Sequence, residues 1–175
     1  MIVDGSLLEG VRGNPRVGVL VVDEYMPVPA YVEKAQARFL SLLSACPMWA
    51  FTNNGRDLRS GLLLPKGTSV IDKPRANAFA GTDLQKRILD KGVTDLVVMG
   101  YHRDACVAAT IGHLWKGAPD PEDFGAVNFG FKVHTHLHIV HGGSSSKKRD
   151  RPLWYAAARI PEIPEGDRLL IYREI

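Results

Sequence analysis

Cysteine is scarce in this sequence, which has only Cys46 and Cys106 among its 175 residues. Two cysteines supply neither a disulfide framework for a chain of this size nor a four-cysteine zinc site. Long apolar runs are also missing, since the longest, Val17 to Val22, is far too short to cross a bilayer. The start has no basic region followed by an apolar stretch, so we expect no signal peptide. Free thiols in the cytoplasm and no membrane partner are therefore expected.

Neither sign of charge dominates strongly, because the net charge is only +3 and the sequence pI is about 8.9. Basic residues are scattered except between Lys147 and Arg151, in a polar stretch over 142–152. We expect no nucleic-acid partner. The basic cluster is either a solvated loop or a site for an anionic group. The glycines form neither a phosphate loop nor a dinucleotide fingerprint, so no cofactor is expected.

Strand-like and helix-like segments alternate along the chain. Apolar, β-branched runs and helical periodicity predict strands over 17–22, 48–52, 69–72, 96–100, 131–140 and 168–172, and helices over 30–44, 82–91, 104–115 and 153–159. Such alternation predicts an α/β fold with a three-layer, Rossmann-like architecture. We expect a mostly parallel sheet of about five to six strands in one domain over 1–175, with 1–16 as an N-terminal arm.

Three residues with reactive or charged side chains follow predicted strands. Ligands bind beyond the carboxyl ends of parallel strands, and Asp23 lies at such an end. Lys73 follows another strand, and Cys106 starts the helix after 96–100. A helix N-terminus and a nearby cation stabilise a thiolate, which predicts a lowered pKa for Cys106. Taken singly, each residue is more readily explained by packing, a turn or solvation.

Together, three segments resemble the isochorismatase-like cysteine hydrolases. The strand Val19 to Asp23 ends in an acid, as does the first strand of that family. Over 71–84, Lys73 is followed six residues later by Phe79 and then by a Thr-x-Leu helix start. Over 96–110, a strand ends in Gly100 and Cys106 follows six residues on. The resemblance covers about residues 17 to 114.

The resemblance implies a catalytic triad of Asp23, Lys73 and Cys106. Asp23 would accept the Cys106 proton, Lys73 would stabilise charge, and the thiolate would attack an amide carbon to form a thioester. The family also implies a non-proline cis peptide at Tyr101–His102. The backbone N–H groups of His102 and Cys106 would then bind the oxyanion. A small-molecule substrate and a homo-oligomer, a dimer or tetramer, are implied as well.

Substrate contacts are expected from residues that flank these segments. Arg75 and Arg103 are candidates to bind a substrate carboxylate. The full expected set is Tyr25, Phe79, Arg75, Tyr101, Arg103 and His141.

The sequence departs from the family in three places. Glu24 and Tyr25 follow the acid, where many members have Gln or Asn two residues on. Residues 52–59 contain no histidine, which argues against a metal-dependent nicotinamidase. Residues 117–130 are an insertion, and the following strand lacks the usual Asp-Ala, which leaves the substrate open.

Alternating histidines mark the expected strand over 131–140. His134, His136 and His138 would share one face, where three imidazoles are a possible metal site. Side chains two residues apart stand roughly 7 Å from each other, however, so we expect no metal and favour packing. His141, at the end of this strand, is the better candidate for substrate contact.

Three functions are consistent with the sequence. The first is a metal-independent cysteine hydrolase that cleaves a C–N bond of a small amide, imide or ureido compound. The second is a non-catalytic binding or assembly protein of the same fold. The third is an enol ether hydrolase that uses the aspartate without the cysteine, as isochorismatases do.

Overall fold

A seven-stranded sheet organises the computed structural model, which describes residues 2–112, 122, 124–136, 138–142 and 168–174. The strand order is β1-β7-β6-β5-β2-β3-β4, and every neighbouring pair is parallel. The predicted α/β fold is thus confirmed, with one strand more than the upper expectation. The strands are β1 Ile2–Ser6, β2 Val17–Val22, β3 Met48–Asn53, β4 Ser69–Lys73, β5 Asp95–Gly100, β6 Lys132–His136 and β7 Leu169–Glu174.

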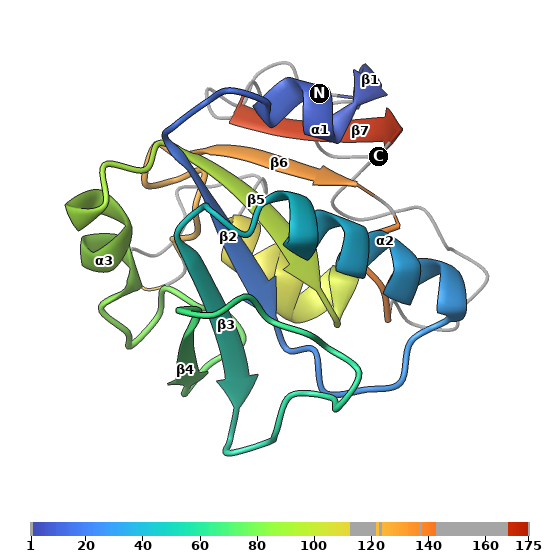
Figure 1. Cartoon of the computed structure of the whole chain (residues 1–175). Coiled ribbons are helices and arrows are strands. Elements are labelled where there is room, and N and C mark those ends of the chain that lie inside the picture. The colour runs from blue at the N-terminus through green and yellow to red at the C-terminus, as the bar shows by residue number, and fades with distance from the viewer. Residues whose placement is uncertain (1, 113–121, 123, 137, 143–167, 175) are drawn as a thin grey trace.

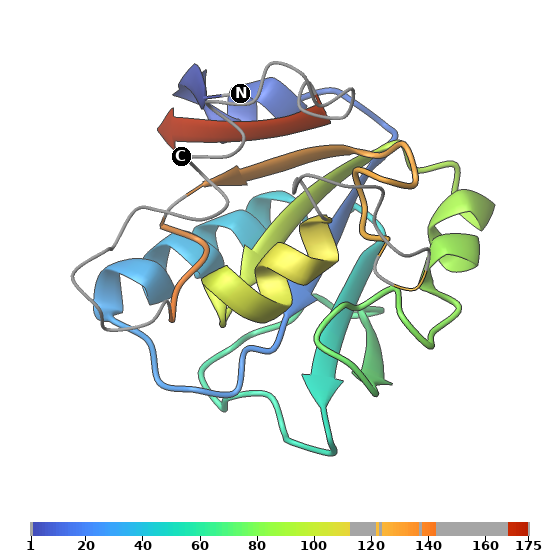
Figure 2. The same cartoon turned by 180° about the vertical axis from the view of Figure 1, so that it is seen from behind.

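Helices cover both faces of the sheet, as Figures 1 and 2 show: α2 crosses one face, and η1 with α4 lies on the other. This arrangement gives the three layers that the sequence predicts. None of the helices within the described residues has the length and apolarity of a membrane span. The helices are α1 Leu7–Val11, α2 Ala30–Leu42, α3 Leu84–Asp90, the π-helical turn η1 Arg103–Val107 and α4 Ala108–Ile111.

The first residues differ from the expected N-terminal arm. They form β1, which pairs in parallel with β7, and α1, which buries Leu7 and Val11. In Figure 1 the two chain ends accordingly lie at the same side of the molecule. Because the partner strand comes from the other end of the sequence, the local turn signals of this segment do not reveal its place in the sheet.

The central strands β2 and β5 form the core of the sheet. All six residues of β2 are buried, which agrees with the prediction of a strand covered on both faces. Gly100 ends β5 with φ +146°, and a Cβ there would lie 2.0 Å from the Val22 carbonyl oxygen. Only glycine fits this close approach, which brings the ends of β2 and β5 together.

Two predicted elements end earlier than expected. The strand expected over 131–140 stops at His136, because the Ile139 N–H turns back to the His136 carbonyl at 3.0 Å. The helix expected over 104–115 starts as the η1 turn and continues as α4 to Ile111. The predicted helix over 153–159 lies outside the described residues, as do 143–152 and much of the 117–130 insertion.

Candidate active site

Unusual backbone conformations mark one edge of the sheet. Asp23 has φ 55°, Asn54 has φ 56° and His102 has φ 60°, and they are the only non-glycine residues with positive φ among the described residues. Asp23 directly follows β2, Asn54 directly follows β3, and His102 lies two residues after the end of β5. Left-handed backbone costs about 1–3 kcal/mol for such residues and gathers at functional sites. This edge of the sheet is therefore a candidate functional site.

A buried ion pair joins Asp23 to Lys73. The Lys73 Nζ lies 2.9 Å from Asp23 Oδ2, and the two side chains are 0% and 1% exposed. The ammonium also donates to the Arg75 carbonyl oxygen at 3.0 Å. Strand β3 lies between β2 and β4, so the lysine side chain reaches its partner across the end of β3. Charges this deeply buried are stable only when they are paired.

The Cys106 thiol lies against this pair and is 7% exposed. Burial and the neighbouring Asp23 carboxylate raise the pKa of the thiol to about 11, while Lys73 acts in the opposite direction. The predicted lowering of the Cys106 pKa is therefore wrong. Loss of solvent and a close negative charge outweigh the lysine, and the helical segment around the cysteine is short. The resting cysteine is a thiol at neutral pH.

The backbone before Cys106 also differs from expectation. No peptide bond within the described residues is cis, so Tyr101–His102 is trans and the predicted cis bond is wrong. The chain instead changes direction through the left-handed His102, with φ 60° and ψ 54°. The predicted oxyanion role of the His102 and Cys106 amides stays a prediction.

Aromatic side chains gather beside the thiol. The Tyr25 hydroxyl lies 2.9 Å from His102 Nε2, and the Tyr101 ring centroid lies 4.2 Å from that of His102 and 5.1 Å from that of His141. Burial raises the pKa of Tyr25, and Asp23 and Cys106 raise it further. Three predicted substrate-contact residues, Tyr25, Tyr101 and His141, are thus brought together near the thiol.

The other three predicted contacts are placed differently. Phe79 is buried against Phe129 and Phe131, with ring centroids 5.2 and 6.2 Å apart, so it packs in the core behind the lysine segment. Arg75 is exposed and pairs with Glu122 at 2.7 Å. Arg103 is half-buried, and its backbone N–H donates to the His141 carbonyl oxygen.

A buried polar network surrounds Glu24, which sequence reasoning noted only as a departure. His141 Nε2 donates to Glu24 Oε1 at 2.9 Å, Arg59 Nε lies 3.3 Å from Oε2, and the Gln36 amide also donates to the carboxylate. The glutamate is fully buried, and it ties α2, the 54–62 loop and the segment after β6 together. A signal existed in the sequence, because Gln36 interrupts the apolar stripe of the helix over 30–44.

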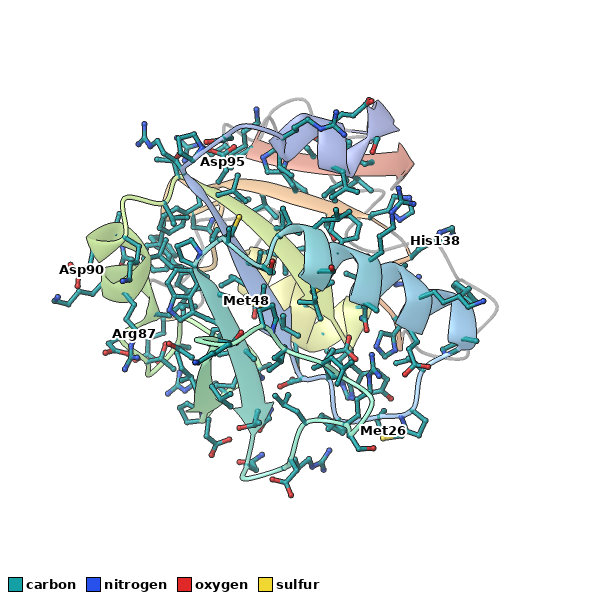
Figure 3. The ribbon with its side chains drawn as sticks, viewed as in Figure 1. Met26, Met48, Arg87, Asp90, Asp95 and His138 are labelled. Carbon is teal, nitrogen blue, oxygen red and sulfur yellow. The ribbon has the colours of Figure 1, made fainter. Side chains whose placement is uncertain are left out.

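The histidine row does not form one site. His134 Nε2 donates to Asp95 Oδ1 at 2.9 Å, and its Nδ1 lies 2.9 Å from the Tyr172 hydroxyl. Figure 3 shows Asp95, which begins β5, far from His138. His138 lies beyond the strand, and its N–H donates to His136 Nδ1. Within the part of the chain that the structure describes, no three His, Cys, Asp or Glu side chains are grouped to hold a metal ion.

Two cavities lie at opposite ends of the strands. One of about 470 Å³ adjoins the site and is lined by Tyr25, Pro27, Val28, Glu33, Arg59, Ser60 and Gly61. Another, of about 370 Å³, lies where β3 and β4 begin, near Met48. The second cavity is remote from the Cys106 thiol. The first shares Tyr25 with the aromatic group beside the thiol, but Asp23, Lys73 and Cys106 do not line it.

Solved structures with the same fold include several hydrolases. A nicotinamidase from Staphylococcus aureus superposes with a TM-score of 0.65 at 18% identity, covering 89% of this chain and 99% of its own. An N-carbamoylsarcosine amidase from Thermoplasma acidophilum gives 0.64 at 16% identity, with 90% and 96% covered. A putative isochorismatase-family hydrolase from Chromobacterium violaceum gives 0.66 at 20% identity, with 90% of both chains covered.

Sequence comparison is more specific than fold. No curated protein matches the chain significantly. The model of the isochorismatase domain matches residues 13–116, more than half of the chain and all three segments around Asp23, Lys73 and Cys106. These segments are the ones that meet at the strained edge of the sheet. The chain therefore belongs to the isochorismatase domain family.

Proposed function

We propose that this protein is a metal-independent cysteine hydrolase that cleaves a C–N bond of a small amide, imide or ureido compound. The observation that carries the proposal is the buried Asp23–Lys73 ion pair against the Cys106 thiol. Asp23 Oδ1 is buried and accepts no hydrogen bond within the described residues. A carboxylate oxygen that is not engaged by another donor and lies beside a nucleophile is the arrangement that general-base activation needs.

The first half-reaction would form a thioester. As Cys106 Sγ bonds to the substrate carbonyl carbon, its proton passes to Asp23 and the carbonyl oxygen takes up the π electron pair. A raised thiol pKa suits this order of events, because the proton leaves only when the S–C bond forms. When the oxyanion collapses, the C–N bond breaks, and the departing nitrogen takes the proton from Asp23.

The second half-reaction would use water. Asp23 accepts a proton as the water oxygen bonds to the thioester carbon, and the C–S bond then breaks. Asp23 returns the proton to the departing sulfur, and the acid product leaves. Lys73 lies beside both groups and would stabilise negative charge on the aspartate or on the sulfur in turn.

The raised Cys106 pKa also favours a second candidate function. A thiol that stays protonated is compatible with hydrolysis of an enol ether in which only Asp23 transfers a proton. The two mechanisms differ in whether Cys106 is needed for turnover.

The experiment is a screen of small amides, imides and ureides for ammonia or amine release, with intact-mass detection of an acylated protein after acid quench. We expect turnover and an adduct in the wild type and in Cys46→Ala, and neither in Cys106→Ala. Turnover of an enol ether by Cys106→Ala, with loss in Asp23→Asn, would establish the aspartate-only mechanism. Binding of a compound without turnover, in the wild type as in the variants, would indicate a non-catalytic binding protein.

A further inference from the structure

A tight turn leaves the end of β3 next to the site. Asn54 and Gly55 have φ 56° and 68°, and the Arg56 N–H approaches the Asn53 carbonyl oxygen at 3.4 Å. Asn-Gly is the pair that best accepts two successive left-handed residues. The turn fixes the direction in which Arg56 leaves the strand.

The Asp72 carboxylate on β4 holds this turn in place. Its Oδ1 accepts from the Thr52 hydroxyl at 2.9 Å and from the Gly55 N–H at 3.2 Å. Oδ2 lies 3.3 Å from the same N–H. A turn pinned to the neighbouring strand at two points presents its side chains in a fixed place.

Arg56 has a guanidinium with no anionic partner among the residues that the structure describes. Its Cζ lies 4.7 Å from the centroid of the Tyr25 ring, and no carboxylate of the described residues lies within ion-pair distance of it. The nearby arginines differ, because Arg59 pairs with Glu24 and Arg75 with Glu122. Arg56 is exposed and keeps donors for a planar anion such as a carboxylate.

Through Tyr25, Arg56 also lies close to the Cys106 thiol. The Tyr25 ring beneath it reaches His102 through its hydroxyl at 2.9 Å, and Cys106 and Asp23 both raise the pKa of this tyrosine. The pKa of His102 is lowered mainly by burial, and the positive charge of Arg56 contributes to this lowering. The guanidinium is thus part of the electrostatic surroundings of the catalytic candidates.

Asn53, at the other end of the turn, has a buried acceptor without a donor. Its Oδ1 accepts no hydrogen bond within the described residues. Asn53 is in register with Lys73, and registered residues of parallel strands point to the same face. Lys73 on β4 pairs with Asp23 beyond the end of β2, and Asn53 ends the strand that lies between them. A buried acceptor is costly to leave unpaired, and an N–H of a bound ligand would satisfy it.

We propose that the Asn53–Arg56 turn selects the substrate: Arg56 binds a carboxylate, and Asn53 Oδ1 accepts an N–H next to the scissile carbonyl. The substrate class is a small amide or ureide that also bears a carboxylate. The inference rests on the proposed function for the scissile bond. It concerns recognition alone, so it can be tested without turnover.

The test uses alkylation of Cys106 in a Cys46→Ala background, with the modified residue identified by mass spectrometry. Iodoacetate and iodoacetamide differ in the carboxylate, and their rate ratio within one variant at one pH cancels the thiolate fraction. We expect Arg56→Ala to lower the iodoacetate-to-iodoacetamide ratio by about tenfold and Arg56→Lys to restore part of it. Arg38→Ala, which removes an exposed charge on α2, should leave the ratio unchanged. An unchanged ratio in Arg56→Ala would overturn the assignment.

The second arm tests Asn53 in the same background. Iodoacetamide has N–H donors, whereas its N,N-dimethyl derivative has none. We expect Asn53→Leu to lower the rate ratio of the primary to the dimethyl amide about threefold or more, and Asn53→Asp, which keeps an acceptor, to preserve it. Equal ratios in Asn53→Leu and the parent would remove Asn53 from the proposal. Both ratios are independent of whether any amide is hydrolysed, so failure here is distinct from failure of the proposed reaction.

Discussion

The two ends of the sheet each hold one free cysteine, and the contrast between them separates burial from reactivity. Cys46 precedes β3, and burial alone raises its pKa. Cys106 follows β5, where burial and Asp23 raise the pKa and Lys73 lowers it. Both thiols are harder to ionise than a free cysteine. Among the described residues, only Cys106 has a carboxylate beside it to receive its proton, so the location of an acceptor distinguishes the two ends.

Two histidines repeat this contrast. Near the start of β5, His134 contacts Asp95 and Tyr172 with both ring nitrogens, which leaves nothing for a ligand. At the other end, His141 uses Nε2 on Glu24 and presents its ring to Tyr101. A complete set of partners indicates a structural role. Asp23 Oδ1 and Asn53 Oδ1, which accept no hydrogen bond within the described residues, mark the end where a ligand would complete the set.

The largest expected effect comes from exchanging the cysteines one at a time. Cys106→Ala should lower kcat on a confirmed amide substrate by about 10⁴-fold or more, because the covalent step is lost. Cys46→Ala should change kcat less than about twofold. Steady-state ammonia release measures both, and comparable losses in the two variants would contradict the comparison.

Asp23→Asn should lower kcat by about 10²–10⁴-fold, the usual loss for a general base. The same change should lower the pKa of Cys106 from about 11, because Asp23 is one cause of the elevation. A more acidic thiol in a less active enzyme is the expected signature. Alkylation rates followed against pH measure the pKa, with Cys46 in the same protein as the internal control. A Cys106 pKa that rises in Asp23→Asn would refute the assigned role.

Lys73→Met should reduce the free energy of unfolding by about 3–5 kcal/mol, because it leaves the Asp23 carboxylate buried without its partner. Lys91→Met, at the cavity near Cys46, should stay within about 0.5 kcal/mol, because Lys91 is exposed. Urea titrations compare the two. The double variant Lys73→Met with Asp23→Asn should regain part of the loss, and no recovery would mean that the pair is not the cause.

The smallest effect concerns pH and His134. Burial lowers the pKa of His134, so the folded protein keeps it neutral while the unfolded chain takes up a proton below about pH 6.5. Stability from this residue is present above that pH and is lost as the pH falls. The urea midpoint should drop between about pH 7 and pH 5.5, and less so in His134→Gln. His102, whose pKa is also lowered, keeps some dependence in the variant. The same pH dependence of the urea midpoint in the wild type and in His134→Gln would mean that another group causes it.

Much of the fold could be predicted because its signals are local. The unbroken apolar runs of β2 and β5 predict buried parallel strands, and their ends place Asp23 and Cys106 at one edge. β1 could not be predicted in the same way, because its partner β7 lies at the other end of the chain. Phe79 was expected at the substrate, yet its packing against Phe129 depends on a segment about fifty residues away.

The sequence by itself determined the alternation of strands and helices from β2 to β5, the family and the three residues that converge at one edge. Spacing along a chain encodes these features, because period and strand ends are local properties. The tertiary structure decided the direction of the Cys106 pKa shift, the trans peptide before Cys106 and the partners of Glu24. It also decided that Asp23 Oδ1 and Asn53 Oδ1 are buried without a donor among the described residues. Desolvation and hydrogen bonding depend on which distant groups cover a side chain, and only the folded packing sets that.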